Sequence, residues 1–209
     1  MKRYLFFLTL LFTIAALALY EREIVFISPI PKDGGNVEMG FHYNPYEDAI
    51  SVGYQEYCRP CVPADTEGKL VIPDSVQFRG RTLPVCWLSR GSFQSCPHLT
   101  EIRLPKNLKT ISDLAFEGCS SLRDITIPDS VWVIFPRAFI GCTSLRRVRF
   151  LPITPPESYN NDTFDEVTYA TATLVVPAAD ADAYLCNPLS YRFRYHAEEL
   201  PIIYNKEQP

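Results

Sequence analysis

The chain has 209 residues, of which 47% are hydrophobic and 21% are charged, and its formal net charge is −4. This length and apolar share are enough for one packed domain and leave little room for a second. A slightly acidic chain has no general attraction for nucleic acid, so no nucleic-acid partner is expected.

The N-terminus has the pattern of an export signal. Lys2 and Arg3 precede an uncharged apolar run over residues 4–20, and Ala16–Ala18 has the A-x-A form of a cleavage site. We therefore predict a signal peptide over residues 1–18 and a protein that is secreted or held at the cell surface, with the periplasm also open. The apolar run is about as long as the shortest membrane span, so an uncleaved anchor is the alternative. It would be the chain's only contact with a membrane.

Residues 19–68 have turn signals between short runs of alternating polarity. The turns are expected at Lys32–Asn36 and at Asn44-Pro45, and Val37–Phe41 is one of the alternating runs. We predict one or two β-hairpins here. They would cap one end of the structure that follows, because the end of a repeat stack exposes apolar core unless a different unit covers it.

The following residues repeat one phrase with a period of 23. Residues 99–121 and 122–144 align without a gap, and each opens with the pattern L-x-x-I-x-[LI]. A period of 20–29 residues with this opening predicts a leucine-rich solenoid. Within each repeat a strand ends at a proline, and residues 113–118 are expected to form one helical turn. The residues expected to stack in the core share two repeat positions: Phe93, Phe116, Phe139, Cys96, Cys119 and Cys142.

The solenoid is predicted to span residues 69–200, with irregular repeats at both ends. The first repeat contains about nine extra residues near Gln77–Val85, which are expected to form a hairpin turn. A degraded repeat follows Leu145, a last strand is expected at 170–177, and a short helix at 180–185 closes the far end. Residues 201–209 form a tail. The predicted fold class is a β-rich solenoid of the α/β leucine-rich-repeat type, with an N-terminal β cap and a C-terminal strand–helix cap.

One repeat carries a more specific resemblance. Ile125–Leu145 reads I-x-I-P-x-S-V-x-x-I-x-x-x-A-F-x-G-C-x-S-L, which closely resembles the BspA-like leucine-rich repeats of bacterial surface proteins. Ala172–Tyr184 looks like the closing segment of that family. The resemblance covers about residues 69–200. It implies a non-enzymatic role in adhesion, to host matrix proteins or to other cells.

Five arginines fall on outward positions of the predicted strands. An arginine face in an otherwise acidic chain suits carboxylate or sulfate groups, which favours a protein or an acidic glycan as partner. The alternative is a solvated face in which Glu101 or Asp124 pairs with a neighbouring arginine. The candidate ligand-binding residues are Arg103, Arg123, Arg146, Arg147 and Arg149.

The cysteines outside the repeat positions include the pair Cys58 and Cys61. A C-x-x-C pair in an exported chain favours a loop disulfide. A redox motif would need a thioredoxin-like unit, and a zinc site would need a second ligand pair, neither of which the sequence shows. Redox and metal-binding roles for the pair stay as alternatives. The total of seven cysteines is odd, so at least one thiol stays free or pairs between molecules.

No catalytic motif is recognisable in the sequence. The three histidines are isolated, and the nucleophile-elbow, phosphate-loop and dinucleotide-binding patterns are absent. We expect no enzyme activity, no metal and no cofactor. The main alternative to a binding protein is a structural scaffold for an envelope or surface assembly.

Overall fold

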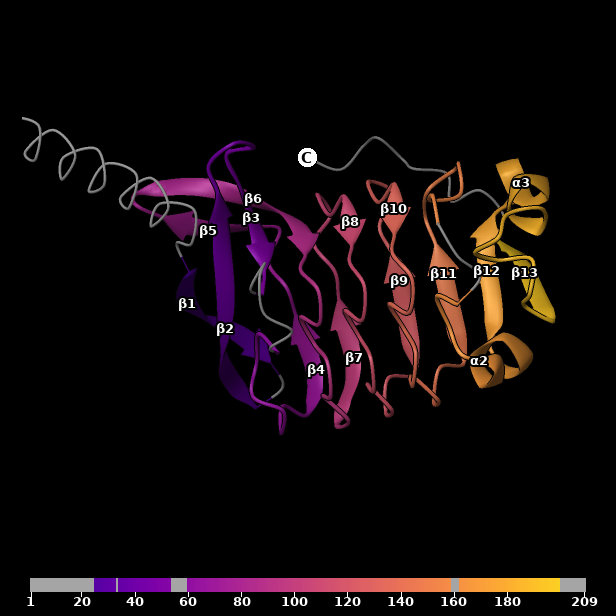
Figure 1. The fold of residues 1–209 in the computed structure, drawn as a ribbon, viewed down its shortest axis with the longest axis horizontal. Helices are drawn as coiled ribbons and strands as arrows, with labels where there is room; N and C mark the ends of the chain where they lie inside the picture. The colour runs from indigo at the N-terminus through magenta and orange to yellow at the C-terminus, as the bar shows by residue number, and fades with distance from the viewer. Residues whose placement is uncertain (1–24, 33, 54–59, 159–161, 200–209) are drawn as a thin grey trace, which may run out of the picture.

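The computed structural model describes residues 25–199 except 33, 54–59 and 159–161. The predicted signal peptide and the tail after residue 200 therefore lie outside the described residues. Within those limits the chain is an elongated coil whose thirteen strands belong to one continuous sheet (Figure 1). The boundaries predicted for the N-terminal region and the solenoid stay predictions.

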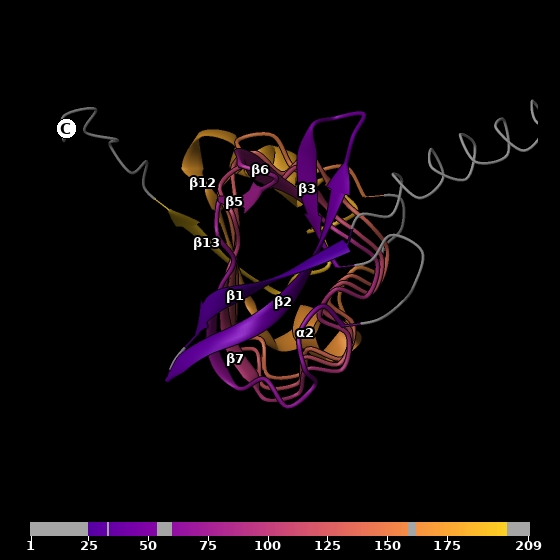
Figure 2. The ribbon, with the colours of Figure 1, turned by 90° about the vertical axis from the view of Figure 1, so that its left-hand side faces the viewer.

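The N-terminal region is antiparallel. It consists of β1 (Val25–Lys32), β2 (Gly35–Asn44) and β3 (Ala49–Val52), paired β1 with β2 and β2 with β3. In the view along the coil, the β1–β2 hairpin runs across the near end of the stack (Figure 2). Met39 and Phe41 of β2 are fully buried, so this hairpin presents apolar side chains to the interior of the coil.

Two ladders of parallel strands run along the coil, and the β1–β2–β3 sheet connects them. The main ladder contains β4 (Gly68–Val71), β7 (Leu99–Arg103), β9 (Asp124–Ile127), β11 (Arg147–Phe150), β12 (Thr173–Pro177) and β13 (Tyr195–Glu199). The second ladder contains β3, β6 (Arg81–Leu88), β8 (Thr110–Ile111) and β10 (Val133–Ile134). The extra residues near 77–85 form an antiparallel hairpin of β5 (Ser75–Phe78) with β6.

Strand register places corresponding repeat residues side by side. Ile125 of β9 lies opposite Val148 of β11, and Thr110 of β8 lies opposite Val133 of β10. Each pair is 23 residues apart in the sequence. A side chain that points inward in one turn of the coil therefore meets its counterpart in the next turn.

The six residues expected in the core are all fully buried. The rings of Phe93, Phe116 and Phe139 stack almost parallel, with centroids 5.3 and 5.0 Å apart. Phe164 continues the stack, 5.0 Å from Phe139. Cys119 and Cys142 donate hydrogen bonds from their thiols to main-chain oxygens one turn earlier, each at 3.1 Å. No single repeat could bury these groups, so the stacking itself creates the core.

The prediction of a helical turn at residues 113–118 is wrong. The segment is a series of turns whose backbone N–H groups bond alternately: Glu117 donates to the oxygen of Leu114 at 3.1 Å, whereas Phe116 donates to that of Ala138 at 2.7 Å and Gly118 to that of Ile140 at 2.9 Å in the next turn of the coil. Because every second donor bonds to the neighbouring turn, the segment does not have the continuous internal hydrogen bonds of a helix. Gly118 has φ of +73°, which a glycine adopts without strain.

The C-terminal end is more elaborate than the sequence predicted. Helix α2 (Glu166–Thr171) precedes β12, helix α3 (Ala181–Leu185) follows it, and β13 then adds one more parallel strand. The strand expected at 170–177 is therefore shorter and is not the last. Asp165 begins α2 by accepting a hydrogen bond from the N–H of Thr168 at 2.7 Å. In the described part of the chain, no helix is long and apolar enough to cross a bilayer.

Candidate ligand-binding face

The outward positions of the main ladder form the candidate face. Along β7 and β9, Ile102 and Ile125 point inward and are buried, whereas Glu101 and Asp124 are exposed. The same alternation continues along β11, where Val148 is buried. Because strand side chains alternate between the two sides of a sheet, every second residue here is available to a partner.

One row of this face has two acidic residues at its centre and a basic residue at each end. Strand register aligns four residues across successive strands: Lys69, Glu101, Asp124 and Arg147. Lys69 pairs with Glu101 at 2.6 Å, and Arg147 pairs with Asp124 at 3.8 Å. The two central carboxylates lie next to each other, and each has a cation on its outer side. The expected solvated ion pairs are therefore present for part of the face.

Asp74 neutralises a second part of the face. Its carboxylate lies 3.8 Å from Arg103 and 3.7 Å from Lys106. The same side chain accepts a hydrogen bond from the backbone N–H of Lys106 at 2.9 Å. Arg149 of β11 is half-buried and lies opposite Thr126. The ion pair with Asp74 makes Arg103 less available to a ligand, and half-burial does the same for Arg149.

Arg123 and Arg146 differ from the other arginines. Arg123 comes directly before β9 and Arg146 directly before β11. The backbone N–H of Arg146 donates to the backbone oxygen of Arg123 at 2.8 Å, so the two residues lie in adjacent turns of the coil. Both are exposed, and among the described residues neither forms an ion pair. The positive charges of the two arginines repel each other, and an anion bound between them would offset this repulsion.

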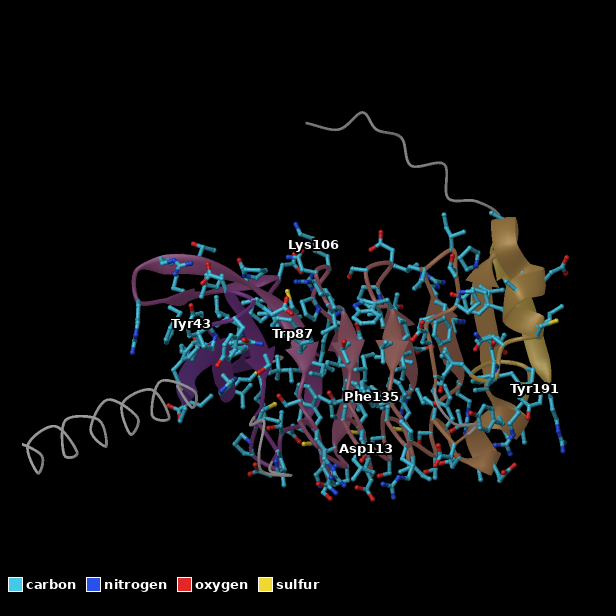
Figure 3. The ribbon with its side chains drawn as sticks, turned by 45° about the horizontal axis from the view of Figure 1, so that its top comes forward. Tyr43, Trp87, Lys106, Asp113, Phe135 and Tyr191 are labelled. Carbon is cyan, nitrogen blue, oxygen red and sulfur yellow. The ribbon has the colours of Figure 1, made fainter. Side chains whose placement is uncertain are left out.

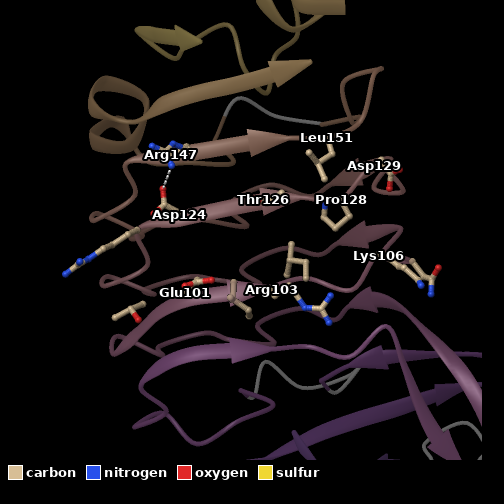
Figure 4. A pocket seen from close by; sticks show the side chains of 14 residues that line it. Glu101, Arg103, Lys106, Asp124, Thr126, Pro128, Asp129, Arg147 and Leu151 are labelled. Atoms are coloured by element: carbon tan, nitrogen blue, oxygen red, sulfur yellow. Dashed lines mark ion pairs between the residues drawn. The ribbon is translucent and has the colours of Figure 1, made fainter. Parts of the chain in front are cut away.

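A shallow groove of about 980 Å³ crosses β7, β9 and β11 (Figure 4). Three of the five predicted arginines line it, namely Arg103, Arg123 and Arg147, whereas Arg146 and Arg149 do not. Its other charged lining residues are Glu101, Lys106, Asp124 and Asp129. The groove is therefore of mixed charge, which the count of outward arginines alone did not reveal.

The candidate disulfide cannot be placed, because Cys58 lies outside the described residues, and the pairing stays a prediction. Cys61 lies between β3 and β4, outside the strands as the sequence suggested, and its side chain is buried near the repeat thiols. Burial, and then the nearby Cys96 thiol, raise the pKa of Cys61 well above its ordinary value. Its N–H donates to the oxygen of Ser92 at 2.6 Å. The six described cysteines form no disulfide with one another.

The described residues contain no candidate metal site. Within the described ranges, no three His, Cys, Asp or Glu side chains gather closely enough to hold a metal ion. His42 is buried in β2 and His98 is exposed at the start of β7, so the two do not form a pair in one site. What the outward face of the main ladder offers is a set of charged side chains at fixed positions on a sheet, which suits non-covalent binding.

A stack of short parallel strands with one apolar ladder per repeat position defines a leucine-rich-repeat solenoid. Residues 85–176 match the family described as BspA type Leucine rich repeat region, in 6 copies. Residues 85–176 therefore carry repeats of the BspA type, which confirms the resemblance seen in the sequence.

Two solved structures are similar to this chain. The pneumococcal vaccine antigen PcpA is 17% identical with a TM-score of 0.46, over 78% of this chain and 46% of that one. A leucine-rich repeat protein from Bacteroides ovatus is 18% identical with a TM-score of 0.37, over 84% of this chain and 53% of that one. The chain thus spans about half the length of both. No curated protein matches it.

Proposed function

We propose that this protein is an exported, non-enzymatic binding protein, and that it recognises an acidic segment of another protein at or outside the cell surface. An acidic glycan is the second ligand of the same chemistry. The observation that carries the proposal is the pair of adjacent, exposed arginines without ion pairs, Arg123 and Arg146. The match to the BspA-type repeat family supports a binding role.

The chemistry of the arginine pair favours a carboxylate or sulfate. A guanidinium offers a planar set of donors that matches such groups with two hydrogen bonds. An anion between Arg123 and Arg146 would also relieve their mutual repulsion. Arg123 lines the groove, so a ligand held there extends over the mixed charges of β7, β9 and β11. That mixture favours a protein segment over a uniformly anionic polymer.

The ends of the coil belong to the same proposal. The β1–β2 hairpin and the α3–β13 segment act as caps, and the 23-residue unit is the structural repeat. The strand register supports this reading, since paired residues of β9 and β11 are 23 apart. Caps that keep the stack monomeric would leave the outward face free for another kind of molecule.

The test is a binding panel of immobilised matrix proteins, sulfated glycans and sialylated glycans. The wild type is compared with Arg123→Glu and Arg146→Glu, each of which changes the net charge by two. Arg79→Glu, at the exposed β5–β6 turn, is the matched control with the same change in charge. We expect the first two variants to lose at least about tenfold in affinity and the control to keep it. Equal binding by all four proteins would refute the proposed face.

A scaffold role is the second candidate. Cys186 is the exposed thiol among the described cysteines, and it could link two copies or a partner. Non-reducing electrophoresis of the exported protein would reveal this. A covalent species that disappears in Cys186→Ser would favour the scaffold, whereas a monomer alone would favour the binding protein.

A further inference from the structure

A second groove lies on the other ladder, over β6, β8 and β10. It encloses about 580 Å³, and Asn107 lines both this groove and the arginine groove. The chain has only two tryptophans, and both of them, Trp87 and Trp132, line it. In Figure 3, Trp87 lies between Tyr43 and Phe135 along the coil, and Tyr191 lies at the C-terminal end.

Trp132 is an exposed aromatic held on a rigid backbone. Its residue surface is 57% exposed, although it directly precedes β10. The backbone of Trp132 is held on both sides. Its backbone N–H donates to the backbone oxygen of Lys109 at 3.0 Å, and its backbone oxygen accepts from the backbone N–H of Glu157 at 2.8 Å. A single exposed apolar side chain is common on protein surfaces. A fixed indole in a groove that holds the chain's other indole is a more specific arrangement.

The two tryptophans are spaced for a ligand longer than one ring. Trp87 lies opposite Thr110, and Thr110 lies opposite Val133, so the tryptophans belong to turns of the coil that are two steps apart. Adjacent strands are about 4.8 Å apart, which separates the two backbone positions by about 10 Å. An occupant that covers both indoles must therefore span several ring-sized units.

The polar lining of the groove is electrically balanced. Lys109 lies 5.6 Å from the centre of the Trp87 ring, and its ammonium is 3.8 Å from the carboxylate of Glu47. The side-chain amide of Asn107 donates a hydrogen bond to the backbone oxygen of Asp74 at 3.3 Å. The side-chain oxygen of Asn107 is left as an acceptor. The charged pair can exchange hydrogen bonds with hydroxyl groups, but it offers no net attraction for an anion.

A peptide could not be bound here by adding a strand. The outer edge of β10 is already bonded to the chain itself, since Val133 forms a bridge with Glu157 and the N–H of Ile134 donates to the oxygen of Glu157 at 3.0 Å. Recognition in this groove must therefore use side chains. Indole faces beside a few hydrogen-bonding groups suit a molecule with an apolar face and a polar rim.

We propose that the Trp87–Trp132 groove binds a neutral oligosaccharide, with pyranose rings stacked on the indoles and hydroxyl groups bonded to Glu47, Asn107 and Lys109. A pyranose combines a face of C–H groups with a rim of hydroxyls, which matches this lining. The site is separate from the arginine pair and takes an uncharged ligand, so it goes beyond the function proposed above.

Intrinsic fluorescence tests this directly, because both tryptophans of the chain line the groove. The full protein is titrated with short neutral oligosaccharides of β-linked glucose, mannose or galactose. We expect a saturable change in tryptophan emission with at least one of them. Trp132→Ala should weaken binding by about tenfold or more, and Trp132→Phe by less, because phenylalanine keeps a stacking face.

The controls separate this site from the arginine face and from unfolding. Tyr191→Ala removes another half-exposed aromatic and should bind sugar normally, as should Arg123→Glu. The melting temperature of Trp132→Ala should stay that of the wild type, since the side chain is largely exposed. The proposal is overturned if no oligosaccharide changes the emission at millimolar concentration, or if Trp132→Ala binds as tightly as the wild type.

Discussion

Inside the coil, successive turns repeat the same residue type at the phenylalanine and cysteine positions, whereas along the central outward row they place residues of different charge. Phe93, Phe116 and Phe139 share one inward position and stack ring on ring. The outward row at β4, β7, β9 and β11 instead changes from Lys69 to Glu101, Asp124 and Arg147.

The difference has a physical cause. An inward side chain is enclosed by its counterparts on both neighbouring turns, so a change of shape in one turn disturbs three. An outward side chain meets water and at most one partner, so its identity can change at little cost. Stability is therefore concentrated inside the coil, and the residues of the proposed binding face lie outside it.

The largest difference between the two regions should be in thiol reactivity. Burial raises the pKa of Cys96 to about 12, so only about one molecule in ten thousand has the thiolate at pH 8. An ordinary cysteine, with a pKa of about 8.5, is about one-quarter thiolate there. We expect iodoacetamide to label Cys96 at least about a thousandfold more slowly in native protein than in urea, while the exposed Cys186 reacts in both.

Mass spectrometry of digested protein would locate the labels. Rapid labelling of Cys96 in the native state would mean that the thiol row is open to solvent, and the distinction between inside and outside would fail at that position.

Phe116→Ala should cause the largest loss of stability. The ring is fully buried between Phe93 and Phe139, and its removal leaves a cavity bounded by two rings. We expect the free energy of unfolding to fall by about 3–5 kcal/mol. Urea denaturation followed by circular dichroism measures it. Ile153→Ala, at a side chain that is 64% exposed, is the control and should unfold like the wild type.

Asp165→Ala should have an intermediate effect. This side chain caps α2 through Thr168 and also accepts a hydrogen bond from the N–H of Gly141 at 3.1 Å, which joins the last repeat to the helix. Loss of a helix cap costs about 0.5–2 kcal/mol. Asp165→Asn keeps one acceptor and should lose less. If both variants melt at the wild-type temperature, the contact between α2 and the coil does not contribute to stability.

Arg147→Ala should have the smallest effect. Its pair with Asp124 is 3.8 Å long, and both side chains are more than half exposed. Exposed pairs of this kind contribute about 1 kcal/mol or less. A double-mutant cycle with Asp124→Ala measures the coupling. A coupling energy well above about 1 kcal/mol would show that the outward row also stabilises the fold. Stability would then not be concentrated inside the coil.

The sequence predicted the interior better than the surface, for the same physical reason. The fixed period identified Phe93, Phe116, Phe139 and the repeat cysteines because an inward position recurs in every turn. It could not predict that residues 113–118 form turns, because the N–H groups of Phe116 and Gly118 bond to the neighbouring turn of the coil and not within the segment.

Features outside the period were the hardest to predict. Cys61 was correctly assigned to a segment outside the strands, but its burial was not predicted, because its backbone bonds to Gly40 and Ser92, which are distant in the sequence. Trp87 and Trp132 were not singled out, because they occupy different repeat positions and only the coil brings them into one groove. Asp74 likewise reaches Arg103 only through the stacking of β4 on β7.

The most direct test of the account is one preparation of Arg123→Glu/Arg146→Glu, measured both for affinity to the strongest ligand from the panel and for its unfolding midpoint in urea. The account predicts an unchanged midpoint and an affinity at least about a hundredfold weaker than that of the wild type. Unchanged affinity, or a midpoint that falls together with it, would contradict the claim that these outward arginines bind a partner without supporting the fold.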